Sequence, residues 1–135
     1  MITRDIELLA LRPEISSAIV RAEMSFDEKF QNKTLRPIIK LQNDLLLASF
    51  RNYISKYKNG FYTLAIEKRL DFIENAVQKD IKFRNALKGM VIGQFTLEEF
   101  ELYIQNSSAL NKRMMHLVIE RIKNNIQLLE YEYSH

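Results

Sequence analysis

The chain has 135 residues, of which 47% are hydrophobic and 27% charged, with three glycines, two prolines and no cysteine. We expect one all-α domain over residues 1–135, because this length suits one core and the composition excludes disorder, a disulfide framework and many turn-linked strands. The net charge is only +3, and the charges are mixed in sign, which argues against a nucleic-acid partner. No segment has the length of a membrane span or the pattern of a signal peptide, so we expect a soluble, cytoplasmic protein.

A short first helix is predicted to begin at Thr3 and to end before Pro13. Arg12 precedes the proline, and this position disfavours the α conformation. Pro13 itself suits the first turn of a following helix.

The next helix is predicted to be long, over residues 14–57, because apolar residues recur at helical spacing on both sides of Pro37. Phe30 and Leu41 are eleven residues apart, about three full turns, so the apolar stripe returns to the same face across the proline. We therefore favour one helix that bends at Pro37. The alternative is a new helix with Thr34 as its N-cap and Pro37 in its first turn.

Asn59 and Gly60 are expected to end this helix in a left-handed conformation. Apolar residues at helical spacing then predict a third helix: Leu64, Ile66, Leu70, Ile73 and Val77. Asp80 is a candidate cap for a fourth helix that Gly93 ends, although the third and fourth helices could also form one bent helix. Gly89 is expected to let a neighbouring helix approach.

The clearest local signal is a capping box at Thr96 and Glu99, in which each side chain bonds the backbone N–H of the other. Phe95 and Phe100 are placed to form a hydrophobic staple around it. The pattern predicts a helix that begins at Thr96 and runs to about Ile104.

A final helix, capped by residues 106–108, is predicted to extend to about Leu129, where its apolar spacing ends. The elements together predict an irregular helical bundle of five to six helices around one long, proline-bent helix.

A metal or catalytic centre is not predicted. His116 and Glu120 share a helix face, but a zinc site needs three or four ligands. Two other charged groups are interpreted as solvent-exposed helix faces: the acidic set Glu67, Asp71 and Glu74, and the basic set Lys79, Lys82, Arg84 and Lys88.

Residues 91–104 have the pattern of a helix-turn-helix, but the second helix carries Glu98, Glu99 and Glu101 and no Lys or Arg. Three carboxylates are unfavourable in a groove bordered by phosphates. There is also no Gly-rich nucleotide loop. We expect no cofactor, no catalytic residue and no nucleic-acid partner.

Three segments resemble a family of short bacterial helical proteins: QNKTLRPIIKLQNDLLLASF, QKDIKFRNALKGMVIGQFT and NSSALNKRMMHLVIERI. The similarity covers residues 26–129, and some members carry a glyoxalase label. Glyoxalases hold their His and Glu metal ligands on the strands of paired βαβββ modules. This sequence departs from that pattern, with no predicted strand and one internal histidine.

Two functions stay open. The first, which we favour, is a non-enzymatic interaction or scaffold protein that self-associates. The alternative is a small-molecule binder or enzyme with a pocket between helices.

Self-association is predicted through Leu47, Phe50 and Ile54. With 100° per residue counted from Arg36, Leu47 and Ile54 fall on the side of the long helix that carries its charged residues, and Phe50 stands at its edge. The opposite, core-facing side is predicted to hold Ile38, Leu41, Leu45 and Ala48. The first helix could cover the three exposed residues, but we favour a second copy in a homodimer.

Overall fold

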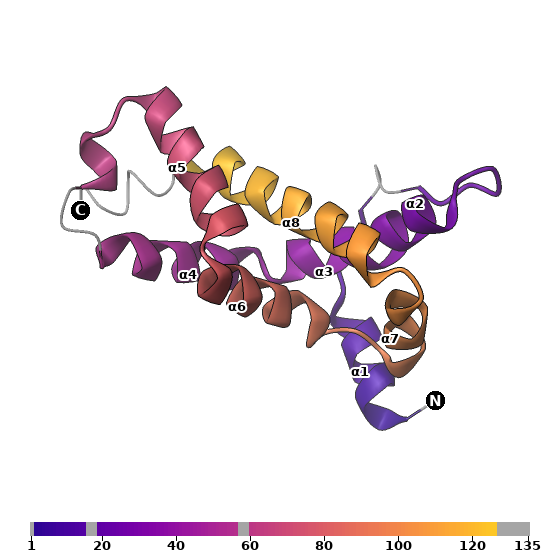
Figure 1. Ribbon diagram of the computed structural model, residues 1–135. Coiled ribbons are helices and arrows are strands. Elements are labelled where there is room, and N and C mark those ends of the chain that lie inside the picture. Colours follow the sequence, from indigo (N-terminus) through magenta and orange to yellow (C-terminus); the bar gives the residue numbers. More distant parts are fainter. Residues whose placement is uncertain (1, 16–18, 57–59, 127–135) are drawn as a thin grey trace.

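The computed structural model describes residues 2–15, 19–56 and 60–126 (Figure 1). Of these residues 79% are helical and none forms a strand, which confirms the all-α prediction. The elements are α1 Thr3–Leu11, α2 Phe26–Phe30, the π-helical turn η1 Gln31–Leu35, α3 Arg36–Leu41, α4 Asn43–Ser55, the short 3₁₀ helix η2 Phe61–Thr63, α5 Ile66–Lys79, α6 Ile81–Ile92, α7 Leu97–Ile104 and α8 Ser107–Asn124. If the continuous segment α2–η1–α3 is taken as one helix, the described residues hold seven helices rather than five or six.

The bundle is organised around α8 and not around a proline-bent helix. At 18 residues α8 is the longest helix that the structure describes, and it contacts α3, α4, α5, α6 and α7. It buries one stripe completely, at the four-residue spacing of a helix face: Leu110, Met114, Val118 and Ile122. Figure 1 shows α1 and α7 together at one end of the molecule, and the last turns of α4 with the start of α5 at the other.

The prediction of one helix over residues 14–57 is wrong at its start. The helix begins at Phe26, after Ser25, whose hydroxyl accepts a hydrogen bond from the Glu28 N–H at 3.2 Å. Residues 12–15 and 19–25 form no helix. Pro13 therefore begins no helix, and polar N-capping at Ser25 sets the boundary that apolar periodicity does not show.

Pro37 does not interrupt the helix, and the alternative of a helix capped by Thr34 is wrong. Both residues lie in continuous helical backbone, with a π turn just before the proline, where the Arg36 N–H bonds the Gln31 carbonyl five residues back. A π turn spreads the backbone at the point where a proline ring would crowd the carbonyl four residues back. The interruption instead lies at Gln42, with φ −88° and ψ 6°.

The interruption changes which side of the helix is buried. In α4 the buried residues are Leu46, Leu47, Phe50 and Ile54, whereas Leu45 and Ala48, predicted to face the core, are exposed. On a helical wheel with 100° per residue, the buried side of α4 is rotated relative to the buried side of α3 by nearly one residue, about 100°. A wheel with one fixed step from Arg36 therefore assigns the wrong side to the core.

Leu47, Phe50 and Ile54 are covered by the chain itself. The Phe50 ring lies 5.5 Å from Phe61 and 6.4 Å from Phe72, between ring centroids. The cover comes from η2, α5, α6 and α8. Neither the first helix nor a second chain is needed, so the premise for self-association at these residues does not hold.

Local signals in the second half are more accurate. Asp80 caps α6 by accepting the Phe83 N–H, so α5 and α6 are two helices, and Gly93 follows the last residue of α6. The expectation for Gly89 is wrong, because a Cβ there would meet nothing within 4 Å. Gly60 has the predicted left-handed backbone, with φ +59°, but it does not end the long helix: α4 ends at Ser55, and Gly60 directly precedes η2. Asn59 and the predicted end at Leu129 lie outside the described residues.

The orientation of α4 can be tested by replacing leucine with alanine at one buried site and at one exposed site of the helix. Leu47 is 1% exposed and Leu45 is 47% exposed. We expect Leu47→Ala to lower the free energy of unfolding by about 2–5 kcal/mol, and Leu45→Ala to change it by about 0.5 kcal/mol or less. Urea denaturation measures both. Equal losses, or a larger loss at Leu45, would contradict the orientation of α4.

Candidate interaction surface

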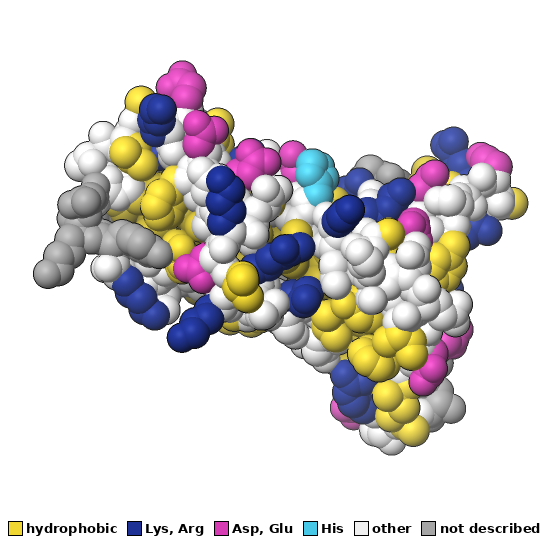
Figure 2. Space-filling model, in the orientation of Figure 1, with side chains coloured by type: hydrophobic (Ala, Val, Ile, Leu, Met, Phe, Trp, Pro, Cys, Tyr) yellow, Lys and Arg dark blue, Asp and Glu magenta, His cyan; other side chains and the backbone are white. Residues whose placement is uncertain are grey.

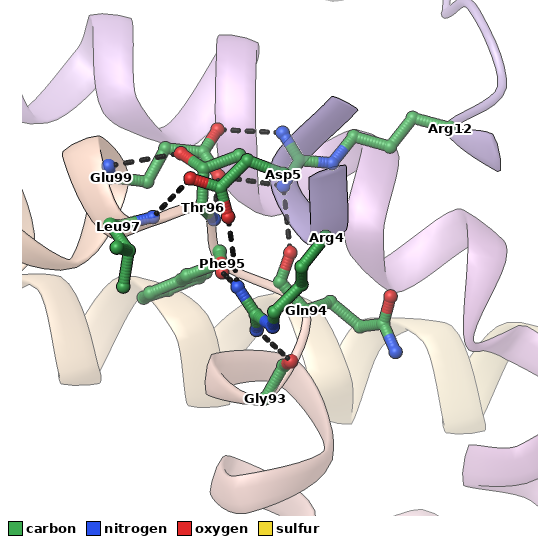
Figure 3. Close-up of polar contacts among 9 residues, drawn as sticks. All are labelled: Arg4, Asp5, Arg12, Gly93, Gln94, Phe95, Thr96, Leu97 and Glu99. Carbon is green, nitrogen blue, oxygen red and sulfur yellow. Dashed lines mark hydrogen bonds and ion pairs between the residues drawn. The ribbon is translucent and has the colours of Figure 1, made fainter. Parts of the chain in front are cut away.

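The first helix is held at the α6–α7 corner by charged side chains at both of its ends. Arg12, the residue before Pro13, has extended backbone with φ −71° and ψ 132°, as predicted. Because the chain leaves the helix at this residue, the guanidinium turns toward α7 (Figure 3). There it meets Glu99.

Arg12 and Glu99 form a bidentate ion pair, with both N–O distances at 2.6 Å. The Glu99 carboxylate also accepts hydrogen bonds from the Thr34 hydroxyl at 2.9 Å and the Thr96 N–H at 2.8 Å. Arg12 in turn donates to the Gln94 carbonyl. Thr34, Thr96 and Glu99 are all buried, so this network joins α1, the π turn and α7 in the interior.

The other end of α1 bonds the free backbone groups of α6 and α7. Arg4 donates to the carbonyls of Gly93 and Phe95, each at 2.9 Å, and the buried Asp5 accepts the Leu97 N–H at 3.1 Å. Figure 3 shows both contacts. A cation near the end of one helix and an anion at the start of the next also suit the two helix dipoles.

The capping box at Thr96 and Glu99 is confirmed, with both reciprocal bonds present and α7 running over the predicted residues. The staple takes a different form, because Phe95 packs edge-on against Phe30 and Tyr103, while Phe100 is 42% exposed and leans on Tyr103. The capping glutamate is therefore also the acceptor for Arg12 and Thr34, which the sequence motif does not reveal.

The network sets the charge state of Glu99. Burial by itself raises the pKa of this carboxyl, but hydrogen bonds from Arg12, the Thr96 N–H and Thr34, together with the Arg12 charge, outweigh burial. The pKa of Glu99 therefore lies below its ordinary value of 4.5, and the carboxylate is ionised at neutral pH.

This polar attachment leaves apolar side chains exposed on both helices. Of the thirteen large hydrophobic residues that the structure describes as exposed, seven belong to α1, its N-cap or α7. Six of them lie on one side of their helix, at three- and four-residue steps, and we call them the α1–α7 apolar surface: Ile2, Ile6 and Leu9 with Leu97, Phe100 and Ile104. Figure 2 shows hydrophobic side chains gathered at this end of the molecule.

The residues considered for metal or acid–base chemistry do not come together. His116 Nε2 and Glu120 Oε1 lie 3.8 Å apart on an exposed part of α8, and no cluster of three or more metal-ligating residues occurs in the described part of the chain. In the acidic set Glu67 and Asp71 are exposed, and Glu74 pairs with Lys123 at 3.4 Å. In the basic set Lys79 and Lys82 are exposed, and Arg84 and Lys88 are partly so.

The clefts in the described part of the chain include two that lie between helices. One, of about 600 Å³, separates α4 from α6 and is lined by Tyr53 and Phe83, whose rings stack at 4.2 Å. The other, of about 560 Å³, lies between α3 and α8 and is lined by Arg36 and Arg121. The sequence indicated neither, because both depend on which helices become neighbours.

Comparisons of the chain with family models, with curated proteins and with solved structures find no match. The resemblance to short bacterial helical proteins stays a prediction. No helix in the described ranges is long and apolar enough to cross a membrane.

The cap at Thr96 gives a direct test of the local network. Thr96→Ala removes the acceptor for the Glu99 N–H, and we expect a loss of about 1 kcal/mol in the free energy of unfolding. Thr96→Ser keeps the hydroxyl and is the matched control. A neutral Thr96→Ala variant in a urea melt would show that the capping bond adds nothing to stability.

The lowered pKa of Glu99 predicts an acid-dependent contribution to stability. Because the folded pKa lies below the unfolded value near 4.5, the contribution is complete above that pH and is lost as the pH falls through the folded pKa. The stability difference between wild type and Glu99→Gln should therefore shrink from about pH 6 to about pH 3. Urea melts across this range measure it.

Glu98→Gln, at an exposed site on the same helix, is the control and should keep a small, constant difference. Asp80, whose pKa the Phe83 N–H and the Tyr53 hydroxyl lower, is present in every variant and cancels. A Glu99→Gln difference that does not change with pH would contradict the assignment.

Proposed function

We propose that this chain is a cytoplasmic, non-enzymatic interaction protein whose α1–α7 apolar surface docks a basic amphipathic helix of another protein. The observation that carries the proposal is the orientation of α1. Its apolar residues Ile2, Ile6 and Leu9 are exposed, while Asp5 is the residue that it buries. An ordinary surface helix does the reverse.

The docking surface is fixed before any partner arrives. Arg12, Arg4 and Asp5 hold α1 by hydrogen bonds and an ion pair to α6 and α7. A surface already ordered in its binding geometry loses less conformational entropy on association. This supports docking of a partner on a rigid face.

The charges on the α7 side of the surface favour a basic partner, while on α1 the half-exposed Arg4 is paired with Asp5 and Glu7 is exposed. Glu98 and Glu101 are exposed on α7 next to Leu97 and Phe100, and α7 carries no Lys or Arg. An amphipathic helix with Lys or Arg beside its apolar stripe complements both features. In a two-fold homodimer through this face, the same carboxylates would approach their own copies, so a second copy is less favoured.

The surface is small. Helices of nine and eight residues are about 12–14 Å long and about 10 Å wide, so the two side by side present roughly 250 Å². This area is well short of the roughly 800 Å² per partner of a standard stable interface. We therefore expect a weak, reversible complex, with a dissociation constant on the order of micromolar or above.

A model peptide tests this proposal. The probe is an 18-residue helix with leucines at i, i+3, i+4 and i+7 and lysines elsewhere, and the matched peptide carries glutamates in place of the lysines. We expect the basic peptide to bind, and the double variant Leu97→Ser, Phe100→Ser to weaken binding by about tenfold or more, roughly 1.4 kcal/mol. Fluorescence anisotropy measures the affinities.

Ile81→Ser is the control, since Ile81 is 71% exposed on α6 and should leave binding unchanged. Equal binding of both peptides, or unchanged binding by the double variant, would contradict the proposal. Sedimentation without peptide tests whether a second copy of the chain occupies the surface instead. If the wild type is a dimer and the Leu97→Ser, Phe100→Ser variant is a monomer, the surface belongs to a homodimer.

A further inference from the structure

We propose that the cleft between α3 and α8 binds the phosphate group of a small organic phosphate monoester, held between Arg36 and Arg121. The cleft has a volume of about 560 Å³, within the range of small-molecule sites. It does not involve α1 or α7, so this proposal is independent of the docking surface.

The first observation is that two guanidinium groups from different helices line one cleft without a carboxylate partner. Arg36 Nε donates to the Asn32 amide oxygen at 3.1 Å, and neither Arg36 nor Arg121 forms an ion pair within the described ranges. The carboxylate in the lining, Glu120, lies at an exposed site 3.8 Å from His116. The lining therefore carries an excess of positive charge.

The second observation is that the π turn places a further donor in the cleft. Gln31 and Arg36 are five residues apart, which in an α-helix would separate them by about 140° around the axis. The π turn, with its bond from the Arg36 N–H to the Gln31 carbonyl, stacks one above the other. Both side chains consequently line the same cleft.

The Gln31 amide is oriented so that it offers N–H groups to a ligand. Its oxygen accepts a hydrogen bond from Arg113 Nη1 at 3.0 Å, which leaves the amide nitrogen as a donor. Asn124 adds another amide to the rim. The cleft thus combines two cations with amide donors.

This donor set favours a phosphate monoester over a simple carboxylate. A phosphate dianion matches two positive charges, and guanidinium groups bind phosphate oxygens in bidentate fashion. Ile39 and Leu117 also line the cleft and provide apolar contact for the organic part of the ester. Inorganic phosphate has no such part and should bind more weakly.

The experiment uses phenyl phosphate, inorganic phosphate and benzoate as probes in isothermal titration calorimetry with the full chain. We expect phenyl phosphate to bind most tightly. Arg36→Gln and Arg121→Gln should each weaken its binding by about tenfold, the loss of one charge-assisted contact. Arg36→Lys keeps the charge but loses the planar fork, and should give an intermediate loss.

Lys112→Gln is the matched control, because Lys112 is an exposed cation on α8 outside the cleft, and it should change binding less than about twofold. Thermal melts establish that each variant is folded, and the Leu97→Ser, Phe100→Ser variant should bind phenyl phosphate as wild type does. The proposal would be overturned if calorimetry detected no binding of phenyl phosphate at concentrations up to about 10 mM, which corresponds to a binding free energy weaker than roughly −3 kcal/mol. It would also be overturned by unchanged binding by both arginine variants, an equal loss with Lys112→Gln, or tighter binding of benzoate.

Discussion

The ion pair between Arg12 and Glu99 is the contact on which the arrangement of this end of the molecule depends. It joins residues 87 positions apart at 2.6 Å, and the same carboxylate also receives Thr34 and the Thr96 N–H. Burying two charges costs several kcal/mol each before their attraction is counted. The cost is offset here because hydrogen bonds supply the carboxylate oxygens with donors from three segments.

The π turn determines two different surroundings within six residues. Thr34 points to Glu99 and belongs to the buried network, whereas Gln31 and Arg36 line the cleft beside α8. In a regular α-helix Gln31 and Arg36 would lie about 140° apart. The extra residue in the turn moves Arg36 to the side of α8. The turn also makes room for the ring of Pro37, which would otherwise crowd the carbonyl four residues back. The local distortion therefore fits the proline and also shapes the cleft.

Features that depend on neighbouring residues could be predicted from the sequence, whereas features that depend on long-range packing could not. Thr96 with Glu99, Asp80 as a cap and the extended Arg12 each depend on neighbouring residues, and the structure has all three. The burial of Leu47 depends on the break at Gln42, whose side chain donates to the Met90 carbonyl on α6. A contact between residues 48 apart leaves no trace in apolar spacing, and for the same reason the Arg12–Glu99 pair and both clefts were not predicted.

The attachment of α1 is the strongest physical reason to regard its apolar side as a binding face. Fully burying a leucine or isoleucine side chain stabilises a fold by about 1.5–3 kcal/mol, and Ile2, Ile6 and Leu9 forgo much of that by remaining exposed. Rotating α1 about its axis would bury them, but it would remove Asp5 from the Leu97 N–H and leave the Glu99 carboxylate without Arg12. Loss of one partner from a buried pair costs about 3–5 kcal/mol, which is comparable with the apolar gain. The polar contacts therefore hold α1 in the one orientation that presents its hydrophobic side outward, next to the exposed residues of α7.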